Sequence, residues 1–229
     1  MSYVRTKIMI IAFLFFSLTG CMSSMIINQM KKMPGLNYLH PVGSNLEKGD
    51  YALYKGSNKS KEISCKYVVL NNSGTSIRLH QSGTNESIFA KSLVEKIEYE
   101  FLLKPNGKVV EAVLIDKEEK SRTKLTKPVH GDFNYMDHNI YIVNPKEISV
   151  KAGRFTVNKV LVVKHTTKYE DTPALVYLLS NDCKFRIVAR AAVLKSDPVL
   201  KDPQKLLSLM IEQPNDFEMD GYVELVEIK

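Results

Sequence analysis

The sequence lacks the motifs that identify the commonest kinds of active site. It contains no Gly-x-Ser-x-Gly segment, which is the nucleophile turn of the α/β-hydrolases, and no glycine-rich loop of the kind that binds phosphate groups. Tryptophan is absent, whereas tyrosine occurs 11 times. The formal charge is +7, but no block of five or more like charges occurs and aromatic residues are not interleaved with the basic ones. This pattern argues against nucleic-acid binding and favours weak attraction to anionic lipids or cell-wall polymers.

The sequence also lacks a run of apolar residues long enough to span a membrane. Its longest apolar run, Ile8–Leu18, is shorter than the roughly 20 residues that a spanning helix needs. Arg5 and Lys7 precede this run, and small residues follow it. A basic start, a short apolar middle and a small-residue end are typical of a secretory signal. We therefore expect residues 1–20 to be a signal peptide.

The residues that end this segment, Leu18-Thr19-Gly20-Cys21, resemble the lipobox of bacterial lipoproteins. The resemblance implies cleavage in front of Cys21 and attachment of diacylglycerol and palmitate to it, so that the protein is anchored on a membrane of the cell envelope. Because position 22 is Met rather than Asp, the resemblance favours the outer membrane over the inner membrane. It leaves the periplasmic and surface faces open. The alternatives are a plain signal peptide followed by a chance cysteine, or an uncleaved anchor.

Residues 21–48 are predicted to form a lipidated tether. Met and Ile residues recur there at helical spacing until Pro34-Gly35 ends the pattern. The tether is either a short helix that lies on the lipid or a locally helical leader that packs on the domain.

Residues 49–229 show a two-residue hydrophobic period and are predicted to form a single antiparallel β domain. The clearest signal is a hairpin, in which Ile97–Leu103 and Val109–Ile115 flank an Asn106-Gly107 turn. Many short strands joined by hairpins predict a mainly β fold, a curved antiparallel sheet that is half-barrel or barrel-like, with one or two short helices. The other predicted strands are 51–55, 63–70, 75–80, 155–163, 175–179, 187–194 and 222–228, and the predicted helices are 89–94 and 202–212.

Two short motifs in this domain carry a family resemblance. Gly49-Asp50-Tyr51-Ala52-x-Tyr54 precedes paired strands, and Ile148-Ser-Val-Lys-Ala152-Gly153-Arg-Phe155 leads into a long strand. Together they resemble exported lipoproteins of the LolA/LolB-like half-barrel type, over most of residues 49–195. The sequence departs from that group in having few helices to cover a concave face and no exposed apolar loop. The resemblance therefore implies the fold more than the activity.

Apart from Cys21, the chain has two cysteines, Cys65 and Cys183. In the oxidising compartments outside the inner membrane, two remaining cysteines are candidates for a disulfide. The alternative is a pair of buried free thiols, because cysteine is among the most buried residue types. The sequence alone does not decide between them.

Few polar residues suggest chemistry. The segment His130–His138 contains two His and two Asp, but their spacing matches no familiar metal site, and a polar loop is the favoured interpretation. Glu98 and Glu100 share one face of a predicted strand and could form a carboxylate pair. Lys96 beside them favours a solvated ladder of charges instead. We predict no catalytic residue, no metal and no cofactor.

The predicted interior contains large side chains, Phe101, Phe155 and Tyr177, and two small ones, Ala189 and Ala191. The small residues either leave room for a ligand or let the 202–212 helix fill the space.

The leading hypothesis is a membrane-anchored, non-catalytic envelope lipoprotein that binds or carries an apolar ligand or supports envelope assembly. Its expected partners are the membrane, through lipid on Cys21, and an apolar ligand or envelope protein. The alternative is a structural or adhesin-like interaction lipoprotein.

Overall fold

The computed structural model describes residues 42–43, 45–58, 61–85, 97–117, 120–124, 136–165, 173–194, 196–214 and 222–229. The lipid-attachment residue Cys21 and the predicted helix 89–94 lie outside these ranges.

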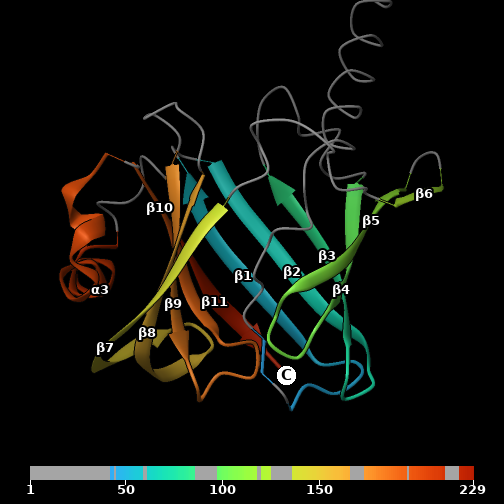
Figure 1. Ribbon diagram of the computed structural model, residues 1–229, viewed down its shortest axis with the longest axis horizontal. Coiled ribbons are helices and arrows are strands. Elements are labelled where there is room, and N and C mark those ends of the chain that lie inside the picture. Colours follow the sequence, from blue (N-terminus) through green and yellow to red (C-terminus); the bar gives the residue numbers. More distant parts are fainter. Residues whose placement is uncertain are drawn as a thin grey trace, which may run out of the picture. The chain divides into compact units, whose positions relative to one another are not determined.

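The domain is one antiparallel sheet of 11 strands in the order β6-β5-β4-β3-β2-β1-β11-β10-β9-β8-β7 (Figure 1). The sheet is open, with β6 and β7 as its two edges. The mainly β fold predicted from the sequence is therefore confirmed, in its open rather than its closed form. The elements are β1 Tyr51–Asn58, β2 Lys61–Asn72, β3 Ile77–Asn85, β4 Ile97–Leu103, β5 Val109–Asp116, β6 Ser121–Lys124, β7 Met136–Val150, β8 Gly153–His165, β9 Pro173–Ser180, β10 Ile187–Leu194, η2 Pro198–Lys201, α3 Pro203–Glu212 and β11 Tyr222–Ile228.

Turn chemistry in the sequence accounts for the hairpins. Gly107 has a φ of 81° and donates its N–H to the carbonyl of Lys104, while the side chain of Asn106 accepts from the N–H of Lys108. Glycine adopts this positive φ without steric cost, which explains why the chain reverses there. Gly74, with a φ of 79°, does the same between β2 and β3. The predicted β4–β5 hairpin is confirmed.

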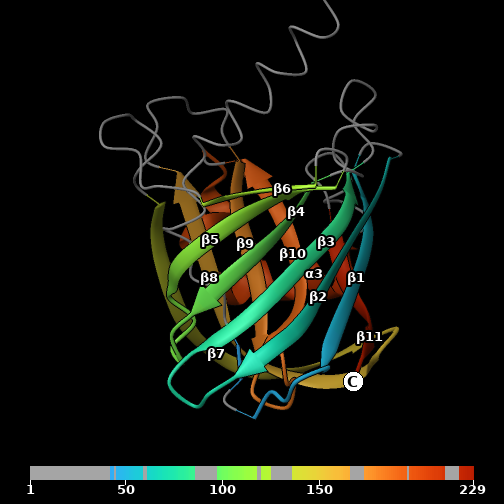
Figure 2. The same ribbon diagram turned by 90° about the vertical axis from the view of Figure 1, so that its right-hand side faces the viewer.

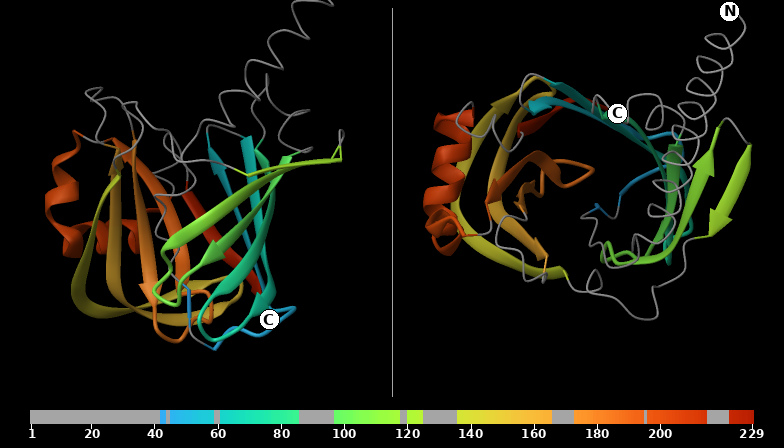
Figure 3. Two further views of the ribbon diagram at one scale, coloured as in Figure 1. Left: turned by 45° about the vertical axis from the view of Figure 1, so that its right-hand side comes forward. Right: turned by 90° about the horizontal axis from the view of Figure 1, so that it is seen from above.

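The sheet is strongly curved, so that β2–β5 and β8–β10 form two facing walls (Figures 2 and 3). The hydroxyl of Tyr54, on β1, donates to the carbonyl of Ile187, on β10, at 3.0 Å, although β11 lies between these strands. Burial raises the pKa of Tyr67 on β2, and Tyr177 on β9 adds to that rise. Strands that are not neighbours can approach one another in this way only across the inside of a curve. Tyr54, Tyr67 and Tyr177 therefore define the concave face.

Residues that pair across antiparallel strands point to the same face of the sheet, so the register assigns each remaining side chain to the concave or the convex face. Gly56 lies on the concave face, where a methyl group on its Cα would overlap the carbonyl oxygen of Tyr222. Glycine is thus required for the close approach of β1 and β11. Large side chains that are almost fully buried on the concave face are Val69, Leu79, Leu103, Leu114, Leu161 and Leu225.

Helix α3 lies on the convex side of the sheet, against β7 (Figures 1 and 3). Asp202 caps its N-terminus by accepting from the N–H of Lys205 at 3.0 Å, as the sequence predicts. The apolar side of α3 is buried through Leu206, Leu207 and Met210. The helix does not fill the concave side, which excludes the alternative that helix 202–212 occupies the inside of the sheet.

Two further expectations for the interior also change. Ala189 and Ala191 pair with Leu178 and Val176 on the convex face, where small residues allow close packing. Phe155 is half-buried beside the turn from β7 to β8 rather than inside the curve.

The edge strands β6 and β7 are not predicted from the sequence. β6 has only four residues, and the β7 segment is interrupted by polar residues and Pro145, which is tolerated because β7 is an edge strand. At this point the N–H of Asn144 donates to the side chain of Gln204 in α3 at 2.8 Å. The helix therefore satisfies a backbone group that the edge would leave open.

The described part of the predicted tether packs on the domain. Val42 and Leu46 are buried, and Leu46 accepts a hydrogen bond from the side chain of Asn72. Asp50 forms an ion pair with Lys184 at 3.1 Å. These contacts join the start of the domain to the loop between β9 and β10.

Candidate functional site

The segment His130–His138, for which a polar loop is the favoured interpretation, falls mostly outside the described residues. His130 lies outside the described residues, and the side chains of Asp137 and His138 on β7 are likewise not described. Among the described residues, no group of three or more His, Cys, Asp or Glu side chains could hold a metal ion.

Cys65 and Cys183 are buried free thiols around Tyr54. The Sγ of Cys183 donates to the carbonyl of Ile187 at 3.6 Å, the same carbonyl that Tyr54 binds. Burial raises the pKa of Cys65 and raises the pKa of Cys183 to about 11. Both thiols are therefore protonated at neutral pH and are weak nucleophiles. The disulfide between them stays a prediction.

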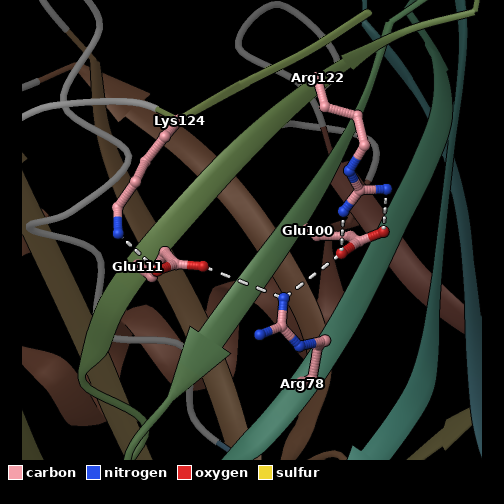
Figure 4. Close-up of polar contacts among 5 residues, drawn as sticks. All are labelled: Arg78, Glu100, Glu111, Arg122 and Lys124. Atoms are coloured by element: carbon pink, nitrogen blue, oxygen red, sulfur yellow. Dashed lines mark hydrogen bonds and ion pairs between the residues drawn. The ribbon is translucent and has the colours of Figure 1, made fainter. Parts of the chain in front are cut away.

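The convex face of β3–β6 carries a network of ion pairs (Figure 4). Glu100 accepts two hydrogen bonds from Arg122, at 3.0 and 2.7 Å, and lies 3.5 Å from Arg78. Arg78 also reaches Glu111 at 4.0 Å, and Glu111 pairs with Lys124 at 2.7 Å. The hydrogen bonds from Arg122 hold the pKa of Glu100 below its usual value.

The neighbouring carboxylate, Glu98, also contacts basic side chains. Glu98 contacts the Nε2 of His80 at 3.0 Å and is paired with Lys117. Glu98 and Glu100 thus each face cations, but their side chains are only 13% and 10% exposed, so the pairs are not the solvated ladder that the sequence suggests, and Lys96 lies outside the described residues. Glu100, which is paired and has a lowered pKa, is poorly suited to act as a general acid or base near neutral pH.

The concave face has a different character, because aromatic and aliphatic side chains dominate it. The rings of Tyr54 and Tyr67 meet edge to face with centroids 5.9 Å apart. The rings of Tyr99 and Phe101 stack at the same centroid distance. Phe101 and Tyr177 are thus on the concave face, as predicted.

Exposure on the concave face changes along β3, β4, β9 and β10. Side chains are buried toward the end where β3 and β10 begin and half-buried toward the end where they finish (Figure 1). We call the second end the exposed end. It carries Gln81, Tyr99, Phe101, Leu175, Arg190 and Ala192. Apolar side chains that remain partly exposed inside a curved sheet form a surface on which an apolar molecule can lie.

Arg190 is the feature of this surface that sequence reasoning missed. It pairs with Tyr177 and Val223, so its side chain is on the concave face. The positive charge of Arg190 lowers the pKa values of Tyr54, Tyr67 and Cys65, although burial raises them by more. This effect indicates that the charge lies near these three groups. The sequence does contain a sign of this residue's importance, because Arg190 interrupts the otherwise apolar strand Ile187–Leu194.

No family model and no curated protein matches the chain. Several solved structures do. In the MucA/MucB complex of Pseudomonas aeruginosa, the match has 7% identity and a TM-score of 0.35, and covers 79% of this chain and 50% of that chain. A hypothetical protein from Chlamydia trachomatis matches with 8% identity and a TM-score of 0.40, over 81% of this chain and 89% of that chain.

A DUF1329 family protein from Desulfovibrio piger matches with 9% identity and a TM-score of 0.30, over 67% of this chain and 69% of that chain. The chain spans about half the length of the MucB chains that it matches. At these TM-scores the likenesses do not bear on function. None of the helices within the described ranges is long and apolar enough to cross a membrane.

Proposed function

We propose that the mature protein is a membrane-anchored envelope lipoprotein of the half-barrel type, which binds the acyl part of an apolar ligand on its concave face and catalyses no reaction. One observation carries this proposal: aromatic and aliphatic side chains of three strands, β4, β9 and β10, are partly exposed at the exposed end of that face. Covering apolar surface stabilises a complex by about 25 cal/mol per Å². The paired carboxylates and protonated thiols support a role without catalysis.

A photoactivatable palmitate probe, applied to membranes that contain the full-length protein, tests this function. We expect saturable cross-linking that unlabelled palmitate displaces. Ala192→Phe places a ring at the exposed end and should lower labelling at least about tenfold, because filling a surface that contacts ligand removes those contacts. Val110→Phe adds the same ring at an exposed position and should label like the wild type.

A second candidate function, docking of a protein partner, is supported by the edge strand β7. Ile140 and Ile142 on this strand are 51% and 85% exposed. Exposed apolar edge strands are templates for pairing with another chain. If the wild-type protein shows no saturable labelling by palmitate, ligand binding is contradicted and this interaction function takes precedence.

A further inference from the structure

Arg190 occupies a defined row across the concave face. The register pairs Leu161 with Tyr177, Tyr177 with Arg190, and Arg190 with Val223. Leu161, Tyr177 and Val223 are buried, whereas Arg190 is half-buried. Arg190 thus stands in an apolar row, and it is the partly exposed member of that row.

Tyrosines from the facing wall complete the surroundings of Arg190. Tyr67 is on β2, and its pKa responds to both Arg190 and Tyr177. The ring of Tyr54 meets that of Tyr67, and the hydroxyl of Tyr54 binds the carbonyl of Ile187 on the same strand as Arg190. Arg190 therefore lies between two walls that supply aromatic rings and hydroxyl groups.

Arg190 shares its part of the concave face with a second cation. Lys159 is on the same face as Arg190, since it pairs with Leu179 and Ile142. In the described stretches of β8, β9 and β11 that flank Arg190, the register places no acidic side chain on the concave face, because Glu224 and Glu227 of β11 point to the convex side. On the facing wall, buried Asp116 of β5 pairs with Ile97 and lies on the concave face. A guanidinium in apolar surroundings binds carboxylate or phosphate oxygens through short, strong, paired hydrogen bonds.

We propose that the ligand of the concave face is an amphiphile with an anionic head group, and that Arg190 binds that head group while the acyl chain lies over Tyr99, Phe101 and Leu175. This inference rests on the proposed function and adds the chemical class of the ligand. A neutral lipid of the same chain length lacks the charge that Arg190 recognises. It should therefore bind more weakly at the same surface.

The test compares photoactivatable probes that share one C16 chain and differ in head group: the fatty acid, the alkyl phosphate and the fatty alcohol. Membranes containing the full-length protein are labelled with each probe. We expect the fatty acid or the alkyl phosphate, whichever binds more tightly, to have an apparent affinity at least about tenfold higher than that of the fatty alcohol. A difference of this size corresponds to one pair of charge-assisted hydrogen bonds. The acid and the phosphate then distinguish a carboxylate ligand from a phosphate ligand.

Arg190→Gln should remove the preference for anionic probes while the alcohol still labels. Arg190→Lys should retain part of the preference. Lys159→Gln, which removes a second cation from the described part of this face, should keep most of it. Equal labelling of wild-type protein by all three probes, or an unchanged preference in folded Arg190→Gln, would overturn the head-group assignment and leave the proposed function standing. Absence of saturable labelling by every probe would overturn both.

Discussion

At the scale of single residues, the two faces of the sheet treat charge in opposite ways. On the convex face, Glu100 is surrounded by Arg78 and Arg122, and its side chain is only 10% exposed. On the concave face, Arg190 lies in one row with Tyr177 and Val223. A carboxylate held by two guanidiniums stabilises the fold, whereas the proposed role of Arg190 is to bind the anionic head group of a ligand.

The Glu100 network predicts a specific loss of stability in acid. Its folded pKa is lowered, so its stabilisation is present above the unfolded pKa of about 4.3 and is lost as pH falls through the folded pKa. Glu100→Gln should lower the free energy of unfolding at pH 7 by about 1 kcal/mol, and this deficit should vanish below the folded pKa.

Urea unfolding of both proteins at pH 7 and pH 3, followed by circular dichroism, measures this difference. Glu147→Gln is the matched control, since Glu147 is 65% exposed and its 3.8 Å pair with Arg154 is screened by water. A deficit for Glu100→Gln that persists unchanged at pH 3 would contradict the role given to its charge.

At the scale of elements, helix α3 covers the convex face near β7 rather than the inside of the curve. Lys146 on β7 donates from its Nζ to Ser208 at 3.0 Å and pairs with Glu212 at 2.9 Å. Together with the bond from Asn144 to Gln204, these contacts fasten the helix to the edge strand. The helix therefore contributes stability and edge protection, and it leaves the concave face to other roles.

Met210→Ala tests this division of roles. Met210 is fully buried, so truncating it should lower the free energy of unfolding by about 2–5 kcal/mol. Labelling of the folded variant by the palmitate probe should stay within about twofold of the wild type, because the helix is on the other side of the sheet. Exposed Lys205 provides the control, as Lys205→Ala should change stability by less than about 0.5 kcal/mol. A folded Met210→Ala variant that loses labelling would place the helix in the binding surface.

At the scale of the whole molecule, the proposed function combines a lipid anchor at Cys21 with an apolar concave face. Acyl chains on Cys21 would hold the protein at the membrane, since each buried methylene contributes about 0.8 kcal/mol. The domain described here starts with residues 42–50 packed against β2 and the β9–β10 loop.

Cys21→Ala tests the anchor in living bacteria. Metabolic labelling with a palmitate analogue should mark the wild-type protein, and the variant should lose this label because it lacks the thiol that accepts diacylglycerol. Cys183→Ala should keep the label, since Cys183 is buried within the fold. Retention of wild-type labelling by Cys21→Ala would show that this cysteine is not the acylated residue.

Local signals were enough to predict most strands and the cap of α3. Asn106-Gly107 predicts its hairpin because glycine tolerates positive φ, and Asp202 predicts the helix start because its carboxylate satisfies a free N–H. The strands β6 and β7 were missed because their pattern is short or interrupted by polar residues and proline. Their pairing depends on neighbours that are distant in sequence.

The faces of β10 show most clearly what the sequence could not decide. Strict alternation places Ile187, Ala189 and Ala191 on one face, but the register shifts between Ile187 and Ala189, so Ile187 is concave and the two alanines are convex. A bulge forms in response to the partner strand, not to the local sequence. The sequence by itself thus determined that the chain forms an antiparallel sheet with an apolar face. Only the tertiary structure decided which residues line the inside of its curve, and that Arg190 is among them, because curvature and register arise from pairing across the whole sheet.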